Sequence, residues 1–152
     1  MRLWRICRRR FVTDVATGEG ARLYGGRWNS RGVRVVYAST SLALAAMETF
    51  VNLEPNVQPH DLVSIEGLIP GEVRIERLEP KALPSDWHRR RNQSLRRLGD
   101  EWIEAGRSAA LLVPSAAICG EWNVLLNPLH PEFVRIRFDR PQPFRFDARM
   151  FR

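Results

Sequence analysis

Short strand-like runs that do not alternate with helical stretches place the strongest constraint on how this 152-residue chain folds. Helical periodicity is confined to two stretches, about 42–53 and 88–105. A doubly wound parallel sheet needs a helix between successive strands, so the sequence predicts an α+β fold with mostly antiparallel strands and two main helices. The strand-like runs lie at 3–7, 33–38, 62–68, 72–77, 109–113, 133–138 and 144–146.

Length and apolar content predict a single domain spanning residues 1–152. A chain of this size buries roughly two thirds of its unfolded surface, and 44% hydrophobic residues are enough to fill a core. No apolar run reaches the roughly 18 residues of a membrane span, and the first residues lack the apolar stretch of a secretory signal. We therefore expect a cytoplasmic protein without membrane association.

The cysteines and histidines do not form a recognisable metal or disulfide pattern. Cys7 and Cys119 lack CxxC spacing and are expected to be reduced packing residues. His60, His88 and His130 stand alone, without the neighbours that a zinc site requires. A structural metal is therefore not expected.

The charged residues are segregated along the chain, which carries a formal net charge of +7. Residues 1–10 and 85–97 hold five arginines each, whereas residues 41–80 hold seven acids and two arginines. This separation suits a polyanionic ligand or an acidic partner. For any single run, a solvated arginine-rich surface is the simpler explanation.

A glutamate in an apolar helix is the most informative candidate for chemistry. Between Leu42 and Val51 every residue except Glu48 and Thr49 is apolar, so this helix is expected to be covered on more than one side. Burying a carboxylate is costly unless a partner compensates. Glu48 is thus either a structural carboxylate paired with an arginine or a functional acid inside a cleft.

A glycine-rich turn and a strand-end serine are further candidates. Gly25 and Gly26 precede Arg27, whose guanidinium can bind two phosphate oxygens, although the chain has neither a Walker loop nor a complete dinucleotide fingerprint. Ser115 follows a buried strand and can offer its hydroxyl to a ligand, but it lacks a neighbouring histidine and a GxSxG elbow, so acyl transfer is not expected. Asn123 and Asn127 are expected to organise loop backbone.

Four sequence segments occur in one order along the chain: GGRWNSRG, VVYASTSLALAAMETF, LVPSAA and EWNVLLNP. On the strength of these segments, almost the whole chain resembles the RES-domain family of bacterial toxins. The family's arginine, tyrosine, glutamate and serine fall on Arg27, Tyr37, Glu48 and Ser115. The resemblance implies a fold similar to ADP-ribosyltransferases and an activity that consumes NAD as a substrate, with no bound cofactor. It also implies a cognate antitoxin, a helix-turn-helix DNA-binding protein of the Xre type, and a higher-order toxin–antitoxin assembly.

The chemistry of NAD fits such a set of residues. Nicotinamide leaves the ribose as a neutral molecule and needs no acid, so one carboxylate can suffice, whereas ordinary glycoside hydrolysis usually takes two. We expect Glu48 to hold a ribose hydroxyl and stabilise the oxocarbenium-like charge, and Arg27 to bind the pyrophosphate. Tyr37 is expected to stack on or bond to the nicotinamide end, and Ser115 to hydrogen-bond the nicotinamide ribose or carboxamide.

Two other functions are compatible with the sequence. One keeps the NAD site but transfers ADP-ribose to a protein or nucleic acid. The other is a non-enzymatic, basic nucleic-acid-binding module in which Arg8–Arg10 and Arg89–Arg91 follow phosphates. The second leaves Glu48 in its apolar helix unexplained, and direct nucleic-acid contact is not expected of an NAD-consuming toxin.

Overall fold

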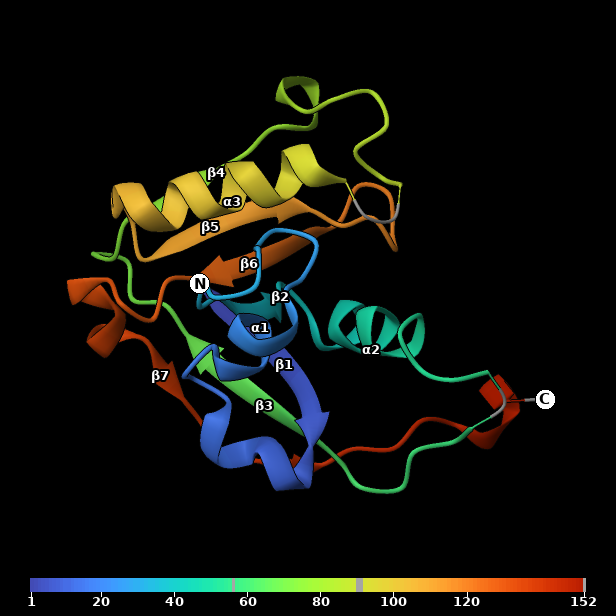
Figure 1. Ribbon diagram of the computed structural model, residues 1–152. Helices are drawn as coiled ribbons and strands as arrows, with labels where there is room; N and C mark the ends of the chain where they lie inside the picture. Colours follow the sequence, from blue (N-terminus) through green and yellow to red (C-terminus); the bar gives the residue numbers. More distant parts are fainter. Residues whose placement is uncertain (56, 90–91, 152) are drawn as a thin grey trace.

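A curled, mostly antiparallel β-sheet forms the centre of the protein (Figure 1). The computed structural model describes residues 1–55, 57–89 and 92–151. The strands follow the order β4-β5-β6-β2-β1-β3-β7, with β8 also paired to β3, and the β4–β5 pair is parallel. The predicted α+β class is therefore confirmed. The strands are β1 (Arg2–Arg8), β2 (Val36–Ser39), β3 (Leu62–Leu68), β4 (Ile75–Arg77), β5 (Ala110–Pro114), β6 (Trp122–Leu126), β7 (Arg137–Phe138) and β8 (Gln142–Pro143).

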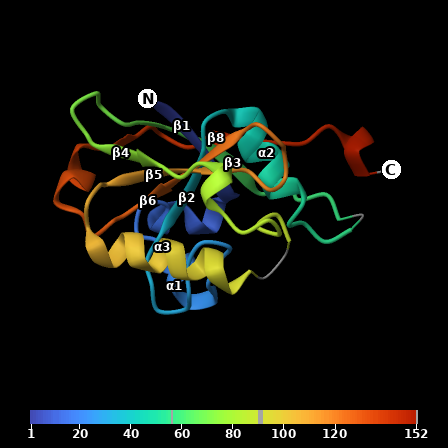
Figure 2. The same cartoon turned by 90° about the horizontal axis from the view of Figure 1, so that it is seen from above.

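Helices gather on one face and at one end of this sheet. The two longer helices, α2 (Leu42–Phe50) and α3 (Gln93–Ala105), match the two that the sequence predicts. A short helix, α1 (Glu19–Tyr24), lies on the same side of the sheet as α3 (Figure 2). No helix in the described ranges is both long and apolar enough to cross a membrane. Short 3₁₀ helices are η1 (Arg9–Asp14), η2 (Pro80–Ala82), η3 (Pro131–Arg135) and η4 (Ala148–Phe151).

Each face of the sheet carries its own hydrophobic cluster. On the α3 side, the helix buries Leu95 and Trp102 against the sheet residues Val113 and Leu125 and against Trp28. This burial follows from the strong segregation of apolar and charged residues around α3. The opposite face is covered by irregular chain, and its buried residues include Leu3, Val36, Val124, Leu126, Ile69 and Ile136.

The sheet opens between β1 and β2. Strand β1 pairs with β3 along all seven of its residues, whereas a single register pair, Trp4 with Ser39, joins it to β2. In the opening, Arg5 donates from Nη1 to the carbonyl oxygen of Tyr37 at 2.9 Å. This bond also joins β1 to β2, and burial lowers the pKa of Arg5.

Of the two strands predicted near the C-terminus, the structure contains only the end of the first and no part of the second. The first part of the 133–138 run belongs instead to the 3₁₀ helix η3, which starts at Pro131. His130 caps this helix by accepting from the Glu132 amide. Only Arg137 and Phe138 of that run pair in the sheet. Residues 144–146 are not a strand either, because Phe144 and Phe146 stack edge-to-face and continue into an aromatic cluster with Phe50 and Phe151.

The surroundings of α2 match the expectation in part. Leu44 and Ala45 are buried, but Val51 just beyond the helix is 50% exposed and Leu42 is 37% exposed. The helix packs on β1 and β2, and Phe50 at its end packs on Phe146 and Phe151, so only its first turn is exposed. The expectation for the cysteines holds only in part, because Cys7 is half-buried whereas Cys119 is exposed; both are free thiols.

Candidate active site

Glu48 faces two neutral hydrogen-bond donors at the end of the sheet. Helix α2 begins immediately after β2 because Ser41 caps it, accepting from the Leu44 amide at 3.1 Å. In its last turn, the helix presents the half-buried Glu48, whose Oε1 accepts from the Ser115 hydroxyl at 2.7 Å and from the Asn123 side-chain amide. The ion pairs found in the described ranges do not include Glu48, so neutral groups, not an arginine, hold its carboxylate there.

Ser115 is held by the turn that follows β5. It is 2% exposed. Its Oγ accepts from the backbone amides of Ala117 at 3.1 Å and Ile118 at 3.0 Å while donating to Glu48. With both backbone donors on the oxygen, the hydroxyl hydrogen is directed at the carboxylate. The strand-end serine is thus brought into contact with Glu48, 67 residues away in the sequence.

Asn123 completes the set of groups around Glu48, and the expectation that it organises loop backbone is wrong. It lies on β6 opposite Ser39 of β2, whose hydroxyl donates to Asn123 Oδ1 at 2.7 Å. That bond fixes which end of the amide faces Glu48. The pairing of Ser39 with Asn123 depends on the β2–β6 register. To predict it, residues 122–126 would first have to be recognised as a strand. Asn127, in contrast, does organise a loop, since its Oδ1 accepts from the Leu129 amide.

Tyr37 fixes the turn that carries Arg27. Its hydroxyl donates to Asn29 Oδ1 at 2.7 Å and accepts from the Trp28 amide at 3.0 Å. Burial raises the pKa of Tyr37, so the hydroxyl stays neutral and keeps its donor. A Cβ on Gly26 would lie on the Tyr37 hydroxyl, so glycine is required at this close approach. The hydroxyl therefore positions the Arg27 turn, and direct contact of Tyr37 with nicotinamide stays a prediction.

Helix α3 holds the same turn from the other side. Arg96 donates from Nε to the Gly26 carbonyl at 3.0 Å, and Asp100 accepts from the Ser30 amide at 2.9 Å. Between them, Gly99 lets the Trp28 carbonyl lie directly on the helix, because a Cβ there would be 1.7 Å from that oxygen. Arg27 therefore sits on a turn fixed by two elements.

A cavity of about 430 Å³ lies beside Ser115 at the ends of β5 and β6. Arg27 donates from Nη1 to the carbonyls of Trp87 at 3.2 Å and Arg89 at 2.9 Å. Trp87 and Ser115 both line this cavity. Of the predicted site residues, Ser115 contacts Glu48 directly. Arg27 is bonded to the carbonyl of Trp87, which lines the cavity, and Tyr37 holds the turn that carries Arg27. Arg90 and Arg91 lie outside the described residues.

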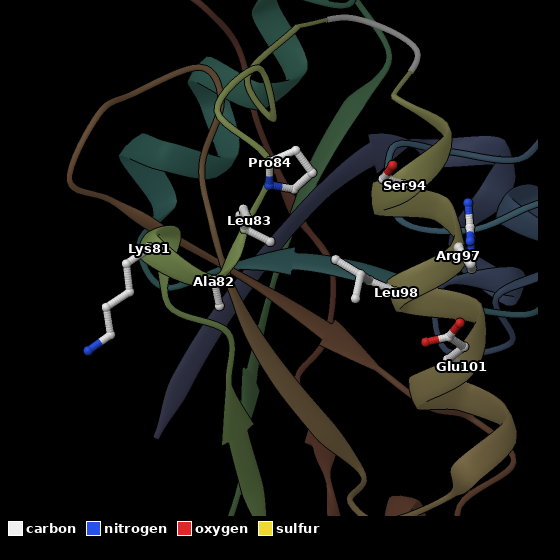
Figure 3. Close-up of a pocket in the computed structure, with 8 residues that line it drawn as sticks. All are labelled: Lys81, Ala82, Leu83, Pro84, Ser94, Arg97, Leu98 and Glu101. Atoms are coloured by element: carbon white, nitrogen blue, oxygen red, sulfur yellow. The ribbon is translucent and has the colours of Figure 1, made fainter.

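A second groove, between the η2 segment and α3, offers no comparable site (Figure 3). In it Leu83 and Leu98 point toward one another, whereas Lys81 extends away from the other labelled side chains. Its polar groups therefore do not converge on one ligand position. Across the described ranges, no three histidine, cysteine or acidic side chains are grouped so that they could hold a metal ion.

Comparisons with known proteins agree with the family resemblance of the sequence. The family model of the RES domain matches residues 2–147. A Sphingobium sp. protein named "Prs ADP-ribosylating toxin" is 37% identical, covering 98% of this chain and 96% of the relative. A Yersinia enterocolitica protein named "Toxin Res" is 36% identical, covering 99% of each chain.

Among solved structures, the fold resembles the crystal structure of the Mycobacterium tuberculosis MbcT–MbcA toxin–antitoxin complex. The TM-score is 0.68 at 15% identity, with 99% of this chain and 86% of the other covered. At that identity the likeness concerns the fold alone. The family match over nearly the whole length and the relatives above 30% identity decide the assignment: this chain belongs to the RES domain family.

Proposed function

We propose that this protein is the toxin of a toxin–antitoxin pair and cleaves the bond between nicotinamide and ribose in NAD. The observation that carries the proposal is the arrangement around Glu48. Ser115 and Asn123 both donate to Oε1, and no hydrogen bond to Oε2 is found within the described ranges. A carboxylate held by one oxygen is preorganised and keeps the other for a ligand.

The chemistry requires one carboxylate and no acid. When the glycosidic bond of NAD breaks, its electron pair goes to the nicotinamide nitrogen, so the ring leaves uncharged and the positive charge develops on the ribose. Glu48, ionised and partly shielded from water, stabilises that oxocarbenium-like charge and accepts a hydrogen bond from a ribose hydroxyl. Water, phosphate or a macromolecule then supplies the nucleophile.

The other predicted site residues have separate roles in this proposal. Arg27 binds the pyrophosphate, and its bonds to the carbonyls of Trp87 and Arg89 orient the guanidinium for it. Ser115 fixes the carboxylate and faces the ribose. Tyr37 acts through the Arg27 turn, because its hydroxyl is used by Trp28 and Asn29.

Release of free nicotinamide by the purified protein tests the proposal. Glu48→Gln keeps the size of the side chain but removes its charge, so it should fold normally and lose about 10²–10³ in rate, or roughly 3–4 kcal/mol of transition-state stabilisation. Glu104→Gln, at an exposed position of α3, is the matched control and should keep full activity. Wild-type rates in Glu48→Gln refute the assignment of Glu48.

Transfer of ADP-ribose to a protein is the second candidate function. One relative is named for ADP-ribosylation of Prs, which favours this acceptor over water. NAD labelled on the adenylate, incubated with cell lysate, separates the two. Labelled protein that depends on Glu48 supports transfer, whereas free ADP-ribose as the sole labelled product supports hydrolysis.

The proposed partner is an antitoxin of the Xre helix-turn-helix type that binds the toxin and, with it, builds a larger assembly. The fold shared with the toxin of a solved toxin–antitoxin complex supports a partner of this kind. The site of action would be the cytoplasm, where NAD is available. Co-expression with the product of a neighbouring helix-turn-helix gene should restore both growth and cellular NAD, whereas continued NAD loss would exclude that gene product as the antitoxin.

A further inference from the structure

A second carboxylate lies beside the Glu48 cluster. The backbone amide of Ser115 donates to the carbonyl oxygen of Glu121 at 2.9 Å. This bond continues the β5–β6 pairing by one pair beyond Pro114 and Trp122. Residues directly opposite each other in an antiparallel pair share a face of the sheet, with Cβ atoms about 4.5–5.5 Å apart. The Glu121 side chain therefore leaves the sheet next to the Ser115 hydroxyl, which donates to Glu48.

Glu121 is open to solvent on the same face as that cluster. The residue is exposed, and it lines the cavity beside Ser115. None of the ion pairs that join described residues includes it. Because side chains alternate along a strand, Asn123, two residues further on, projects from the same face, where it donates to Glu48. A carboxylate between solvent and the Glu48 cluster lies where an acceptor would approach the ribose.

Departure of nicotinamide needs no acid, but attack by the acceptor needs a base. When a water molecule or a hydroxyl group attacks, its oxygen bonds to the anomeric carbon and its proton must be removed. In the proposed reaction Glu48 is occupied, because Oε1 accepts from Ser115 and Asn123 and Oε2 is left for the ribose hydroxyl. We infer that Glu121 is the general base that takes the proton of the acceptor and becomes a neutral carboxyl group. This inference rests on the proposed function.

Among the residues that the structure describes, two other titratable side chains line the cavity, His88 and Cys119. His88 belongs to the segment before α3, and its ring packs edge-to-face on Trp87. Cys119 lies in the turn between Ser115 and Glu121. Of the three groups, Glu121 is the one that the β5–β6 pairing places opposite Ser115. The proton is therefore assigned to Glu121, and His88 is tested beside it.

Rescue by azide distinguishes a missing base from a damaged site. The azide anion attacks through nitrogen and has no proton to lose, so a variant without the base can use azide where water reacts slowly. Glu121→Ala removes the carboxylate and leaves room for the anion. The assay measures nicotinamide release from NAD by the purified protein in phosphate-free buffer, with sodium azide or sodium chloride at equal concentrations. Mass spectrometry of the products identifies ADP-ribosyl azide.

We expect Glu121→Ala in chloride to release nicotinamide about 10²-fold more slowly than the wild-type protein. This is the lower end of general base catalysis, because an oxocarbenium-like transition state bonds the nucleophile only weakly. Azide should raise the rate of Glu121→Ala about tenfold or more and yield ADP-ribosyl azide. Glu48→Gln should gain nothing from azide, because it is impaired in breaking the glycosidic bond. Glu72→Ala, which removes an exposed carboxylate from the turn between β3 and β4, is the matched control and should behave as the wild-type protein does.

Glu121→Gln keeps the size of the side chain and should show the same loss in chloride, so the result does not depend on the folding of one variant. A wild-type rate in Glu121→Ala overturns the inference. A loss in both variants that azide does not restore also overturns it, because it would show a structural role. A loss in His88→Gln that azide restores, with Glu121→Ala unaffected, would assign the base to His88 instead.

These outcomes are separate from those of the proposed function. If the wild-type protein releases nicotinamide and Glu121→Ala does so equally fast, NAD cleavage stands and the assignment of Glu121 falls. If the wild-type protein releases none, the proposed reaction falls and takes the role of Glu121 with it.

Discussion

At the scale of single residues, Asn123 connects the sheet to the carboxylate. Its amide is oriented by Ser39 and donates to Glu48, so it sets the direction of the carboxylate without being placed to react. Asn123→Asp has nearly the same shape but replaces the donor with a second carboxyl group. Two carboxyl groups at hydrogen-bond distance ionise together only at a cost, so the pair retains a proton to higher pH.

We expect Asn123→Asp to lower nicotinamide release at pH 7 by about tenfold or more and to move the acid limb of the pH–rate profile upward by about one unit or more. Activity should therefore recover partly at alkaline pH. Asn92→Asp, at the N-cap of α3, is the matched control, because either side chain can accept from the Ser94 amide, and it should leave the profile in place. A uniform loss at every pH would instead indicate a merely structural Asn123.

Tyr37 is a second residue whose role can be separated from substrate contact. Tyr37→Phe keeps the ring but leaves the Trp28 amide and the Asn29 side chain without their partner. Loss of a buried partner costs about 1–3 kcal/mol, which urea denaturation can measure. Tyr24→Phe is the matched control: this tyrosine is 76% exposed, so its change should stay within about 0.5 kcal/mol.

The same tyrosine predicts how stability depends on pH. Burial raises the pKa of Tyr37 above its value in the unfolded chain, so the folded state holds the phenol proton more tightly. This contribution is complete below about pH 10, the ordinary value for tyrosine, and is lost as the pH rises through the folded-state pKa. Wild-type stability should therefore fall above about pH 10 more steeply than that of Tyr37→Phe, and equal slopes would contradict the burial argument.

At the scale of elements, the contact between α3 and the Arg27 turn depends on one missing side chain. Gly99→Ala would place a Cβ 1.7 Å from the Trp28 carbonyl oxygen, so α3 or the turn must move. We expect a loss of about 1–3 kcal/mol in unfolding free energy, together with a raised Michaelis constant for NAD because Arg27 is displaced.

A glycine of α1 provides the comparison. Gly20 is also helical, but nothing lies within 4 Å of its Cβ position. Gly20→Ala should therefore stabilise the protein by roughly 0.5–1 kcal/mol through helix propensity alone. Thermal or urea unfolding should show a lower unfolding free energy for Gly99→Ala and a higher one for Gly20→Ala. A stabilised Gly99→Ala would show that α3 does not rest on Trp28.

Elements with strong periodicity were predictable, and those governed by local polar contacts were not. The pattern of α3 predicts its buried Leu95 and Trp102 because an amphipathic helix must cover apolar surface. The 133–138 run also alternates, yet Val134 is 85% exposed because Pro131 and the His130 cap favour a 3₁₀ turn. Alternation alone does not distinguish a strand from such a turn.

At the scale of the whole molecule, the candidate site also contains one residue that the sequence pattern identifies and others that it does not. Glu48 stands out in the sequence because a carboxylate in an apolar helix needs partners. Ser39 and Asn123 do not, because their contact depends on the β2–β6 register and no local pattern contains it. Long-range pairing of this kind follows from the topology, so sequence reasoning found Glu48 but missed part of what holds it.

The charge of the whole molecule leads to the last prediction. The net charge of +7 favours binding to nucleic acid, yet many arginines are already engaged. Arg96 holds the Arg27 turn, and Arg8 of the first basic run pairs with Asp61 at 2.8 Å. Further arginines within 4 Å of a carboxylate are Arg2, Arg22, Arg34, Arg77, Arg107, Arg135 and Arg149.

Because these cations already face carboxylates within the fold, they contribute less than free surface arginines to replacing the counterions of a DNA backbone. We expect the protein alone to bind a random-sequence duplex no more tightly than about 10⁻⁵ M at about 0.15 M salt, as measured by fluorescence anisotropy across a salt series. Tighter binding with a steep salt slope, unchanged in Glu48→Gln and without nicotinamide release by the wild-type protein, would instead assign this fold to nucleic-acid binding.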